Sequence, residues 1–217
     1  EVLQAKDGKI RAAAVRVAAQ QYHGVTDLLP LLKTTIKDTH PIVRLETVNA
    51  LRVLDSTSAA EVALQALDSK VDYTINYALE LTVRELSHQW IGKTIFNGNV
   101  KQLTYAVNAS RNPKALSSLY SAYKAGKISS ENQGEALKLI AELGNADQLT
   151  ELYNLTLSDS ISIPVKKAIL VSLFASSQAR GIKPKAKFSE LAKLIKNSQL
   201  ATEVTNLIGE WKVKELI

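Results

Sequence analysis

The sequence predicts an all-α fold, an α-α superhelix of about five to seven helix pairs. Three observations predict it. Of the 217 residues, 46% are apolar and 22% are charged, so a continuous core can be buried. The nine glycines and five prolines are too few for the turns of an all-β chain. Apolar residues recur at helical spacing in tandem segments, two of which make a unit of roughly 30 to 45 residues.

The clearest helix is predicted for Asp38 to Leu54, which reads DTHPIVRLETVNALRVL. Pro41 stands where the first turn of a helix tolerates proline, and Asp38 precedes it as an acceptor for free amide groups. Helical spacing gives this segment an apolar face, made by Val43, Thr47, Ala50, Leu51 and Leu54. The opposite face is expected in solvent and carries Arg44, Glu46, Asn49 and Arg52.

Further helices are predicted on both sides of this segment. Before it they cover residues 9–20 and 25–36, with Gly24 as the break between them and Pro30 as a kink in the second. After it they cover residues 59–67, 72–86, 100–109, 113–125, 130–143, 146–157, 163–176, 187–196 and 199–217. Residues 87–98 are expected to form an inserted turn, Gly144 is expected to cap a helix, and the last, basic pair is expected to cap the stack.

No break in composition divides the chain, so residues 1–217 are predicted to form a single helical-repeat domain. The chain begins at Glu1 and holds no methionine, and we expect it to be a part excised from a longer protein. The absence of cysteine excludes disulfides, thiolate metal sites and covalent c-type haem attachment within these residues. No apolar run approaches the roughly 18 to 20 residues of a membrane-spanning helix, so no transmembrane segment is predicted.

The formal net charge is +6, which permits an acidic partner. Its densest cluster, Lys183, Lys185 and Lys187, is interpreted as a solvated loop. Nucleic acid is the alternative partner that this charge allows. It is the weaker hypothesis, because basic residues alternate with acidic ones elsewhere, as at Arg84 and Glu85.

No constellation of residues predicts catalysis. His23, His40 and His88 stand far apart, without a carboxylate or histidine at ligand spacing, so no metal site is predicted. Phosphate-binding glycine loops and the GxSxG and HExxH motifs are absent from the sequence. Glu80 and Glu85 have basic neighbours on one helix, which indicates a solvated, paired face. We therefore expect a chain that is not an enzyme and has no cofactor.

The spacing of Asp38, Val43 and Arg44 resembles the signature of HEAT repeats, which form armadillo-like helical solenoids. The resemblance implies that an acidic residue in the turn and a basic residue opening the second helix bond along the stack. Asp38 and Arg44 are then structural residues of a repeat ladder. By the same resemblance, Asp159 with Lys166 is a weaker copy of this pair.

A narrower resemblance covers residues 68–157. The strings DYTINYALELTVRELSHQW, IFNG, LTYAV and PKALSSLYSAYKAGKI are similar to the HEAT-repeat segment of large bacterial membrane-bound dehydrogenase-like proteins. In those proteins the segment stands between a sugar-dehydrogenase-type propeller and a c-type cytochrome domain. The residues that carry the resemblance are Asp72, Tyr73, Tyr77, Ala78, Leu79, Thr82, Arg84, Glu85, Leu86 and Trp90.

This resemblance implies a periplasmic or cell-envelope oxidoreductase of which the chain is the middle part. Neither a propeller sequence nor a CxxCH motif is present, so no quinone or haem site is assigned to these residues.

The function expected from these patterns is that of a non-catalytic scaffold that holds neighbouring domains or a partner protein. Contacts are expected on the concave face formed by the second helices, from Arg44, Asn49, Arg52, Asn76, Glu80 and Arg84. Tyr73 and Trp90 are expected to line a contact between domains.

Overall fold

The computed structural model describes residues 2–22, 27–93, 96 and 99–217. Within them it contains thirteen α-helices, several short 3-10 turns and no strand, which confirms the predicted all-α class. The chain divides into two compact units, Glu1–Ser110 and Arg111–Ile217, and each is described by itself. That the whole chain is a single domain stays a prediction.

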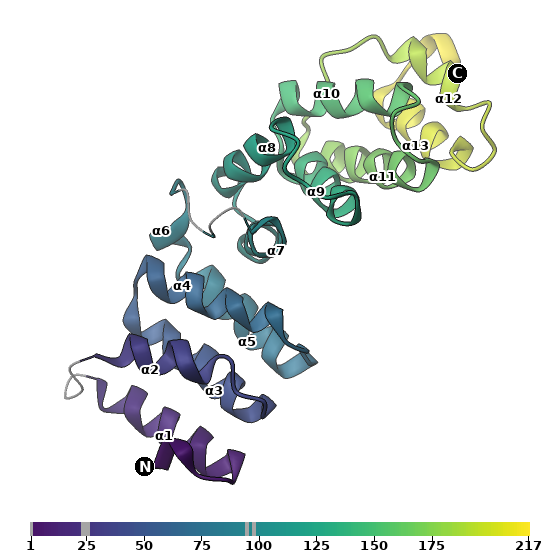
Figure 1. Cartoon of the computed structure of the whole chain (residues 1–217). Helices are drawn as coiled ribbons and strands as arrows, with labels where there is room; N and C mark the ends of the chain where they lie inside the picture. Colours follow the sequence, from purple (N-terminus) through teal and green to yellow (C-terminus); the bar gives the residue numbers. More distant parts are fainter. Residues whose placement is uncertain (1, 23–26, 94–95, 97–98) are drawn as a thin grey trace. The chain divides into compact units, whose positions relative to one another are not determined.

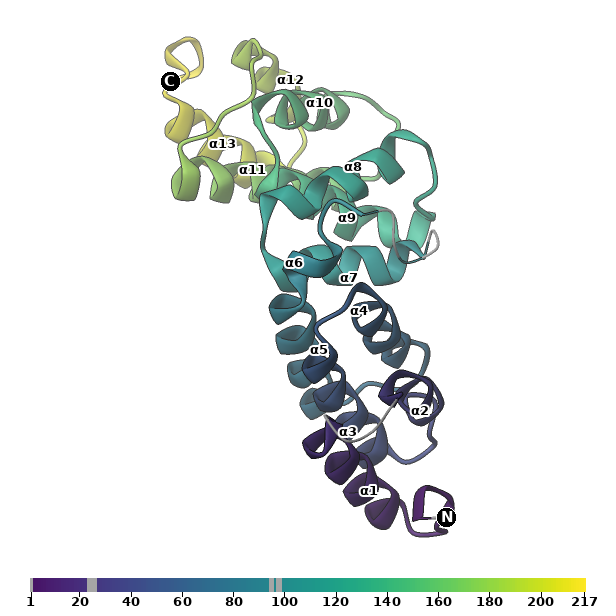
Figure 2. The same cartoon turned by 90° about the vertical axis from the view of Figure 1, so that its left-hand side faces the viewer.

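Unit 1 is built of two layers of helices, and Figure 2 shows α1, α3 and α5 side by side with α2 and α4 against them. The inner helices are α1 (Gly8–Gln20), α3 (Pro41–Leu51), α5 (Tyr73–Glu85) and α7 (Val100–Ser110), each packed on the next. The outer helices are α2 (Leu28–Thr35), α4 (Thr57–Leu64) and α6 (Ser87–Trp90). Short 3-10 turns cover η1 (Val2–Gln4), η3 (Arg52–Leu54) and η4 (Gln65–Asp68).

Unit 2 repeats this arrangement of helix pairs (Figure 1). Its inner helices are α9 (Ser130–Leu143), α11 (Ile163–Arg180) and α13 (Ala201–Trp211), and each packs on the next. Its other helices, α8 (Leu116–Lys124), α10 (Ala146–Leu157) and α12 (Leu191–Leu194), pack on α9, α11 and α13 respectively. Short 3-10 turns cover η6 (Pro113–Ala115), η7 (Phe188–Glu190) and η8 (Lys214–Leu216).

Short polar side chains cap several of the helices, and apolar side chains pack the helices against one another. The side chains of Asp7, Ser56 and Asp72 accept hydrogen bonds from amide groups in the first turns of α1, α4 and α5. Asn145 forms a reciprocal capping box with Gln148 at the start of α10. The side chains that follow at helical spacing are fully buried between the layers, as the predicted helix pairs require.

The helix predicted for residues 38–54 is shorter than expected. α3 begins at Pro41, and its cap is His40, whose Nδ1 accepts from the amide of Ile42 at 3.3 Å. Asp38 was expected to cap this helix, but its Oδ1 accepts from the amide of His40 (2.8 Å) before the helix begins. The expectation is wrong because the turn between Asp38 and Pro41 needs its own acceptor, and Asp38 supplies it.

Arg44 was predicted to lie on the solvent-exposed face of α3 because of its charge and its position on the helix. This prediction is wrong. Arg44 is 6% exposed. The physical reason is that its guanidinium group is turned onto backbone carbonyl groups, which supply the acceptors that water would otherwise provide. Glu46, Asn49 and Arg52 are partly exposed, as expected.

Other predicted boundaries shift for local reasons. Pro30 is the third residue of α2, in the first turn, where amide groups have no partner within the helix, so a kink is not required. The expected break at Gly24 lies outside the described residues. α11 continues past residue 176 to Arg180 and ends at Gly181, whose φ of 64° is left-handed and suits glycine.

Gly144 caps α9 as predicted, but in an extended conformation with φ of −68°. A Cβ atom at this position would lie 2.4 Å from the carbonyl oxygen of Ile140. Glycine is therefore required here by close approach and not by a left-handed φ.

The inserted turn expected at residues 87–98 contains the short helix α6 and a buried Phe96, whereas residues 94, 95, 97 and 98 lie outside the described part. In the last helix pair, α12 covers four residues and α13 covers eleven. Whether that pair caps the stack stays a prediction.

Candidate interaction surface

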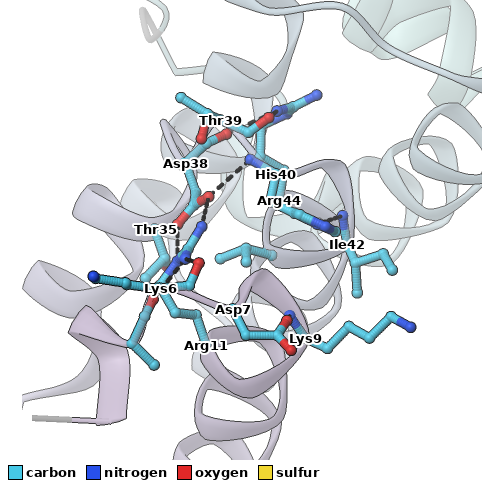
Figure 3. A network of polar contacts seen from close by, with 12 residues as sticks. Lys6, Asp7, Lys9, Arg11, Thr35, Asp38, Thr39, His40, Ile42 and Arg44 are labelled. Carbon is cyan, nitrogen blue, oxygen red and sulfur yellow. Dashed lines mark hydrogen bonds and ion pairs between the residues drawn. The ribbon is translucent and has the colours of Figure 1, made fainter.

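Arg11 of α1 binds Asp38 in the turn before α3, and Figure 3 shows the pair with its neighbours. Its Nε donates to Oδ2 of Asp38 at 2.8 Å and its Nη2 to Oδ1 at 2.7 Å. The remaining nitrogen, Nη1, donates to the carbonyl oxygens of Ala5 (2.7 Å) and Lys6 (3.0 Å). The two side chains are 16% and 14% exposed, so this is a partly buried two-bond ion pair between consecutive repeats.

The carboxylate of Asp38 is kept ionised by these contacts. The hydrogen bond from Arg11 lowers the pKa of Asp38, and the amide of His40 acts in the same direction, whereas burial opposes them. The resemblance pairs Asp38 with Arg44, but Arg44 reaches Asp38 at the backbone carbonyl and the side-chain partner is Arg11.

Arg44 makes the next rung of the ladder. Its Nη1 donates to the carbonyl oxygens of Asp38 (2.7 Å) and Thr39 (3.1 Å), and its Nη2 donates to the carbonyl oxygen of Lys70 at 2.9 Å, in the turn before α5. Arg11 binds the carbonyl groups six and five residues before it, and Arg44 does the same. The two arginines are therefore equivalent positions of one repeat, 33 residues apart, four residues after the caps Asp7 and His40.

The predicted second copy of the ladder, Asp159 with Lys166, is a loose pair. The Nζ of Lys166 lies 3.7 Å from Oδ1 of Asp159. Lys166 is buried, whereas the side chain of Asp159 is fully exposed. The pair joins the loop before α11 to α11 itself and does not reach another repeat. Surface pairs of this geometry contribute little to stability.

The exposed face of α5 carries two tyrosines in a stripe with Glu80 and Arg84. Tyr73 is 85% exposed and Tyr77 is 55% exposed. These four positions follow one another at intervals of four, three and four residues, so they share one face of the helix. We call this set the α5 stripe. Large aromatic side chains with a polar hydroxyl group are enriched where proteins bind one another.

Hydrogen bonds fix the side chains beside the α5 stripe. The Tyr105 hydroxyl group on α7 donates to the backbone oxygen (3.1 Å) or to Oδ1 (3.0 Å) of Asn76, and Nδ2 of Asn76 donates to Oε1 of Glu80 (3.0 Å). Burial, assisted by the Glu80 charge, raises the pKa of Tyr105, so its hydroxyl group stays protonated. Asn76 and Glu80, predicted contact residues, are therefore held in place before any partner arrives.

Three further predicted contact residues, Asn49, Arg52 and Arg84, also make hydrogen bonds within unit 1. Arg52 donates to Oδ1 of Asn49 (2.9 Å) and to Oε1 of Glu85 (3.3 Å). Nε of Arg84 donates to the carbonyl oxygen of Ala109 at 3.1 Å and ties α5 to α7. These groups link neighbouring inner helices, so their polar atoms are only partly available to a partner.

Trp90 is buried and not placed for an exposed contact. It is 2% exposed, its Nε1 donates to the carbonyl oxygen of Val83 at 2.9 Å, and its ring lies 5.8 Å from that of Phe96. Of the two residues predicted to contact another domain, Tyr73 is exposed to solvent, whereas Trp90 is buried in the core of unit 1.

The histidines and carboxylates of the described residues are not gathered into a metal-binding group. No group of three or more His, Asp or Glu side chains that could hold a metal lies among them. His40 caps α3, and the Nε2 of His88 lies 2.8 Å from Oδ1 of Asp55 on the surface. None of the helices in the described part is long and apolar enough to cross a bilayer.

The basic cluster of unit 2 is partly paired. Nζ of Lys185 lies 2.8 Å from Oδ1 of Asp147, and Lys183 and Lys187 are exposed. Nothing in the described part of the chain indicates nucleic-acid binding.

An open hollow of about 430 Å³ in unit 2 lies beside Tyr123, Lys124 and Glu151. Glu151 accepts from Nζ of Lys124 at 2.9 Å. The hydrogen bond with Tyr120 is the larger cause that lowers the pKa of Glu151, and burial raises the pKa of Tyr120 to about 12. Tyr120, Lys124 and Glu151 are therefore bonded to one another beside this hollow.

Two layers of stacked helix pairs, with Arg11 and Arg44 in equivalent positions 33 residues apart, are the geometry of a helical repeat in unit 1. Residues 1–84 match the family model of HEAT repeats. No curated protein and no solved structure matches the chain. The match supports a HEAT-repeat segment over residues 1–84, and the described residues have an all-α fold of helix pairs that is consistent with a HEAT-like solenoid. HEAT repeats are modules that commonly hold protein partners, which fits the surface described above.

Sequence reasoning missed two members of the ladder, Arg11 and the carbonyl group of Lys70. A signal for Arg11 exists in the sequence, because it follows Asp7 by four residues as Arg44 follows His40. The Lys70 contact is made by backbone, which no side-chain pattern reports.

Proposed function

We propose that the chain is a non-catalytic HEAT-repeat scaffold that holds a partner protein or neighbouring domains against the inner helices of unit 1. The observation that carries the proposal is the exposure of Tyr73 and Tyr77 on one face of α5, 85% and 55%. Exposed aromatic side chains on a rigid, hydrogen-bonded helix lose little conformational entropy on binding. Together with Glu80 and Arg84 they give that face both apolar area and charges of each sign.

We further propose that this scaffold belongs to a larger oxidoreductase-like protein of the cell envelope, with the periplasm as its compartment. The support is the resemblance of residues 68–157 to the repeat segment that stands between a propeller and a c-type cytochrome domain. The α5 stripe lies inside that segment. In this proposal the flanking domains are the partners, and the chain itself carries no redox group.

A binding measurement with three purified pieces tests the proposal. The chain is titrated with a propeller domain and, separately, with a cytochrome domain taken from the same longer protein. We expect one of them to bind, and the double variant Tyr73→Ala with Tyr77→Ala to weaken binding by at least about tenfold, as expected of aromatic anchors. Its melting temperature should stay unchanged, because both side chains are exposed.

A matched control is Val171→Ala, since Val171 is a 49% exposed apolar residue of unit 2. It should leave the affinity unchanged. Absence of binding to both domains would remove the proposal, and equal losses from the tyrosine and valine variants would remove the α5 stripe as the contact.

A further inference from the structure

A polar hollow lies within unit 1, lined from α4 and η4, from the turn after α2 and from the start of α7. These elements come from three consecutive helix pairs, so the hollow is an internal feature of the stack. Its volume is about 440 Å³, which is within the range of sites for small molecules. We call it the α4 hollow. Its polar lining residues are Lys37, Glu61, Gln65, Asp68, Asn99 and Gln102.

The side chain of Gln102 indicates that the α4 hollow is a binding site. Gln102 is 7% exposed and lines the hollow, and within the described part of the chain its side-chain amide group has no hydrogen-bond partner. Its backbone amide donates to Oδ1 of Asn99 at 3.1 Å, which fixes the residue in the first turn of α7. Buried amide groups are nearly always hydrogen-bonded, and an unpaired one is unfavourable. A ligand in the hollow would supply the missing partner.

The charges around the α4 hollow are unpaired as well. Glu61, Gln65 and Asp68 follow one another at intervals of four and three residues, so they lie on one face of α4 and η4. Among the described residues, neither carboxylate forms an ion pair, and Lys37 reaches neither of them although it lines the same hollow. Elsewhere in unit 1, charges of neighbouring repeats that face each other do form ion pairs. Two carboxylates and one ammonium group are therefore available to a ligand.

We propose that the α4 hollow binds a free basic amino acid, a ligand with two cationic groups and one carboxylate. Its two cationic groups bind Glu61 and Asp68 and its carboxylate binds Lys37, through charge-assisted hydrogen bonds. Glu61 and Asp68 stand two turns apart, about 10 Å along the helix axis, and the flexible chain of lysine or arginine lets its two cationic groups reach both. The amide group of Gln102 donates to the carboxylate or accepts from a cationic group.

Other small ligands complement this lining less well. An anion would face two carboxylates, and a diamine would face Lys37 without a group to bind it. A neutral sugar would leave all three charges without a counter-charge. The inference does not depend on the scaffold function, because none of the residues that line the α4 hollow belongs to the α5 stripe.

Isothermal titration calorimetry of the whole chain with L-lysine and with L-arginine tests the proposal. We expect at least one of them to bind and to raise the melting temperature of the chain. Two analogues of the amino acid that binds then test its groups. The Nα-acetyl form lacks the α-ammonium group, and the decarboxylated form, cadaverine or agmatine, lacks the carboxylate. Each analogue should bind at least about tenfold more weakly, because it loses one charge-assisted contact.

Two variants test the residues of the hollow. Glu61→Gln should weaken binding by at least about tenfold, because a carboxylate that holds a cationic group is removed. The matched control is Glu210→Gln, since Glu210 is also a partly exposed helical residue without an ion pair in the described part of the chain, but lies in unit 2. It should leave the affinity unchanged. Gln102→Leu should weaken binding without lowering the melting temperature of the ligand-free chain, because its amide group has no partner to lose.

Absence of binding by both amino acids at millimolar concentration would overturn the proposal. A decarboxylated or acetylated form that binds as tightly as the amino acid would overturn it too, as would an unchanged affinity of Glu61→Gln. A lower melting temperature of ligand-free Gln102→Leu would show that the amide group of Gln102 already has a partner in the folded chain, and the observation that points to a ligand would be lost.

Discussion

Arg11 and Asp38 are joined by two hydrogen bonds, Nε to Oδ2 at 2.8 Å and Nη2 to Oδ1 at 2.7 Å, across 27 residues of sequence. The pair connects the body of one helical repeat to the turn of the next. Asp38 uses the same Oδ1 to accept from the amide of His40, the cap of α3. One carboxylate therefore fixes both the packing of α1 on α3 and the start of α3. Substitutions of Arg11 or Asp38 should accordingly be among the most destabilising polar changes in unit 1.

Asp38→Asn should lower the free energy of unfolding by about 1 to 3 kcal/mol, because an uncharged amide cannot accept both guanidinium bonds and leaves Arg11 partly unpaired. Urea denaturation followed by circular dichroism measures it. The control is Asp159→Asn, whose side chain is fully exposed and 3.7 Å from its partner. That change should fall within about 0.5 kcal/mol of the parent chain. Equal effects of the two substitutions would show that the Arg11 pair contributes nothing of its own.

The same pair predicts how stability responds to acid. Because the pKa of Asp38 is lowered in the folded chain, its ionisation stabilises the fold at pH values above its unfolded pKa of about 3.9. This contribution is lost as the pH falls through the lower, folded pKa. The difference in unfolding free energy between the parent chain and Asp38→Asn should therefore be constant near neutrality and shrink below about pH 4. A difference that grows on acidification would contradict the direction of the shift.

Arg44→Lys should be destabilising by about 1 to 3 kcal/mol although the charge is kept. Arg44 is 6% exposed and its two terminal nitrogens bind three carbonyl oxygens from two turns, whereas one ammonium group cannot span them. Arg16→Lys is the matched control, since that side chain is 60% exposed and pairs with Glu46 alone. Thermal melts compare the two variants. If Arg44→Lys melts with the parent chain, the Lys70 contact does not hold the repeats together.

The apolar face of α3 could be predicted from the sequence, whereas the burial of Arg44 on the same helix could not. The apolar spacing of Val43, Thr47 and Ala50 is enough to predict α3 and its buried side, because burial of apolar groups depends on the residue types themselves. The burial of Arg44 could not be predicted, since its acceptors are backbone carbonyl groups and one of them, on Lys70, lies 26 residues away. A charged side chain is by itself expected to be exposed to solvent. The carbonyl groups that replace water as acceptors for Arg44 are brought to it only by the folded structure.

The two aromatic residues of the predicted contact show the same difference between what the sequence can and cannot predict. The exposure of Tyr73 could be predicted, because Tyr73 stands at the first position of α5, just after the cap Asp72, whereas its contact with another domain stays a prediction. Trp90 could not be told from it, because an aromatic residue beside breakers suits a surface and a core equally. The difference is the carbonyl group of Val83, to which the Trp90 indole nitrogen donates, and Phe96, against which its ring packs.

Gly8→Ala should lower the free energy of unfolding by about 1 to 3 kcal/mol through overpacking. A Cβ atom at Gly8 would lie 2.3 Å from Cγ and 2.8 Å from Cβ of His40. Both the Cβ atom and the ring of His40 would therefore have to move, which would disturb the cap of α3. Gly209→Ala is the control, because a Cβ atom there meets nothing within 4 Å and α13 gains helix propensity. Urea denaturation should show a loss for the first variant and no loss, or a gain of up to about 1 kcal/mol, for the second.

Trp90→Phe tests the prediction that residues 1–217 form one cooperative domain. The variant loses the hydrogen bond to Val83 and leaves a cavity beside Phe96, which should destabilise the surroundings of Trp90 by about 1 to 3 kcal/mol. Trp211 is then the single tryptophan, and it lies in unit 2, 5% exposed, with its Nε1 donating to Ser177. In one cooperative domain the destabilisation must appear in the fluorescence of Trp211, as a shift of its urea midpoint to lower concentration with the same slope. A Trp211 transition that keeps the midpoint of the parent chain, while circular dichroism shows earlier loss of helix, would mean that the two units unfold separately.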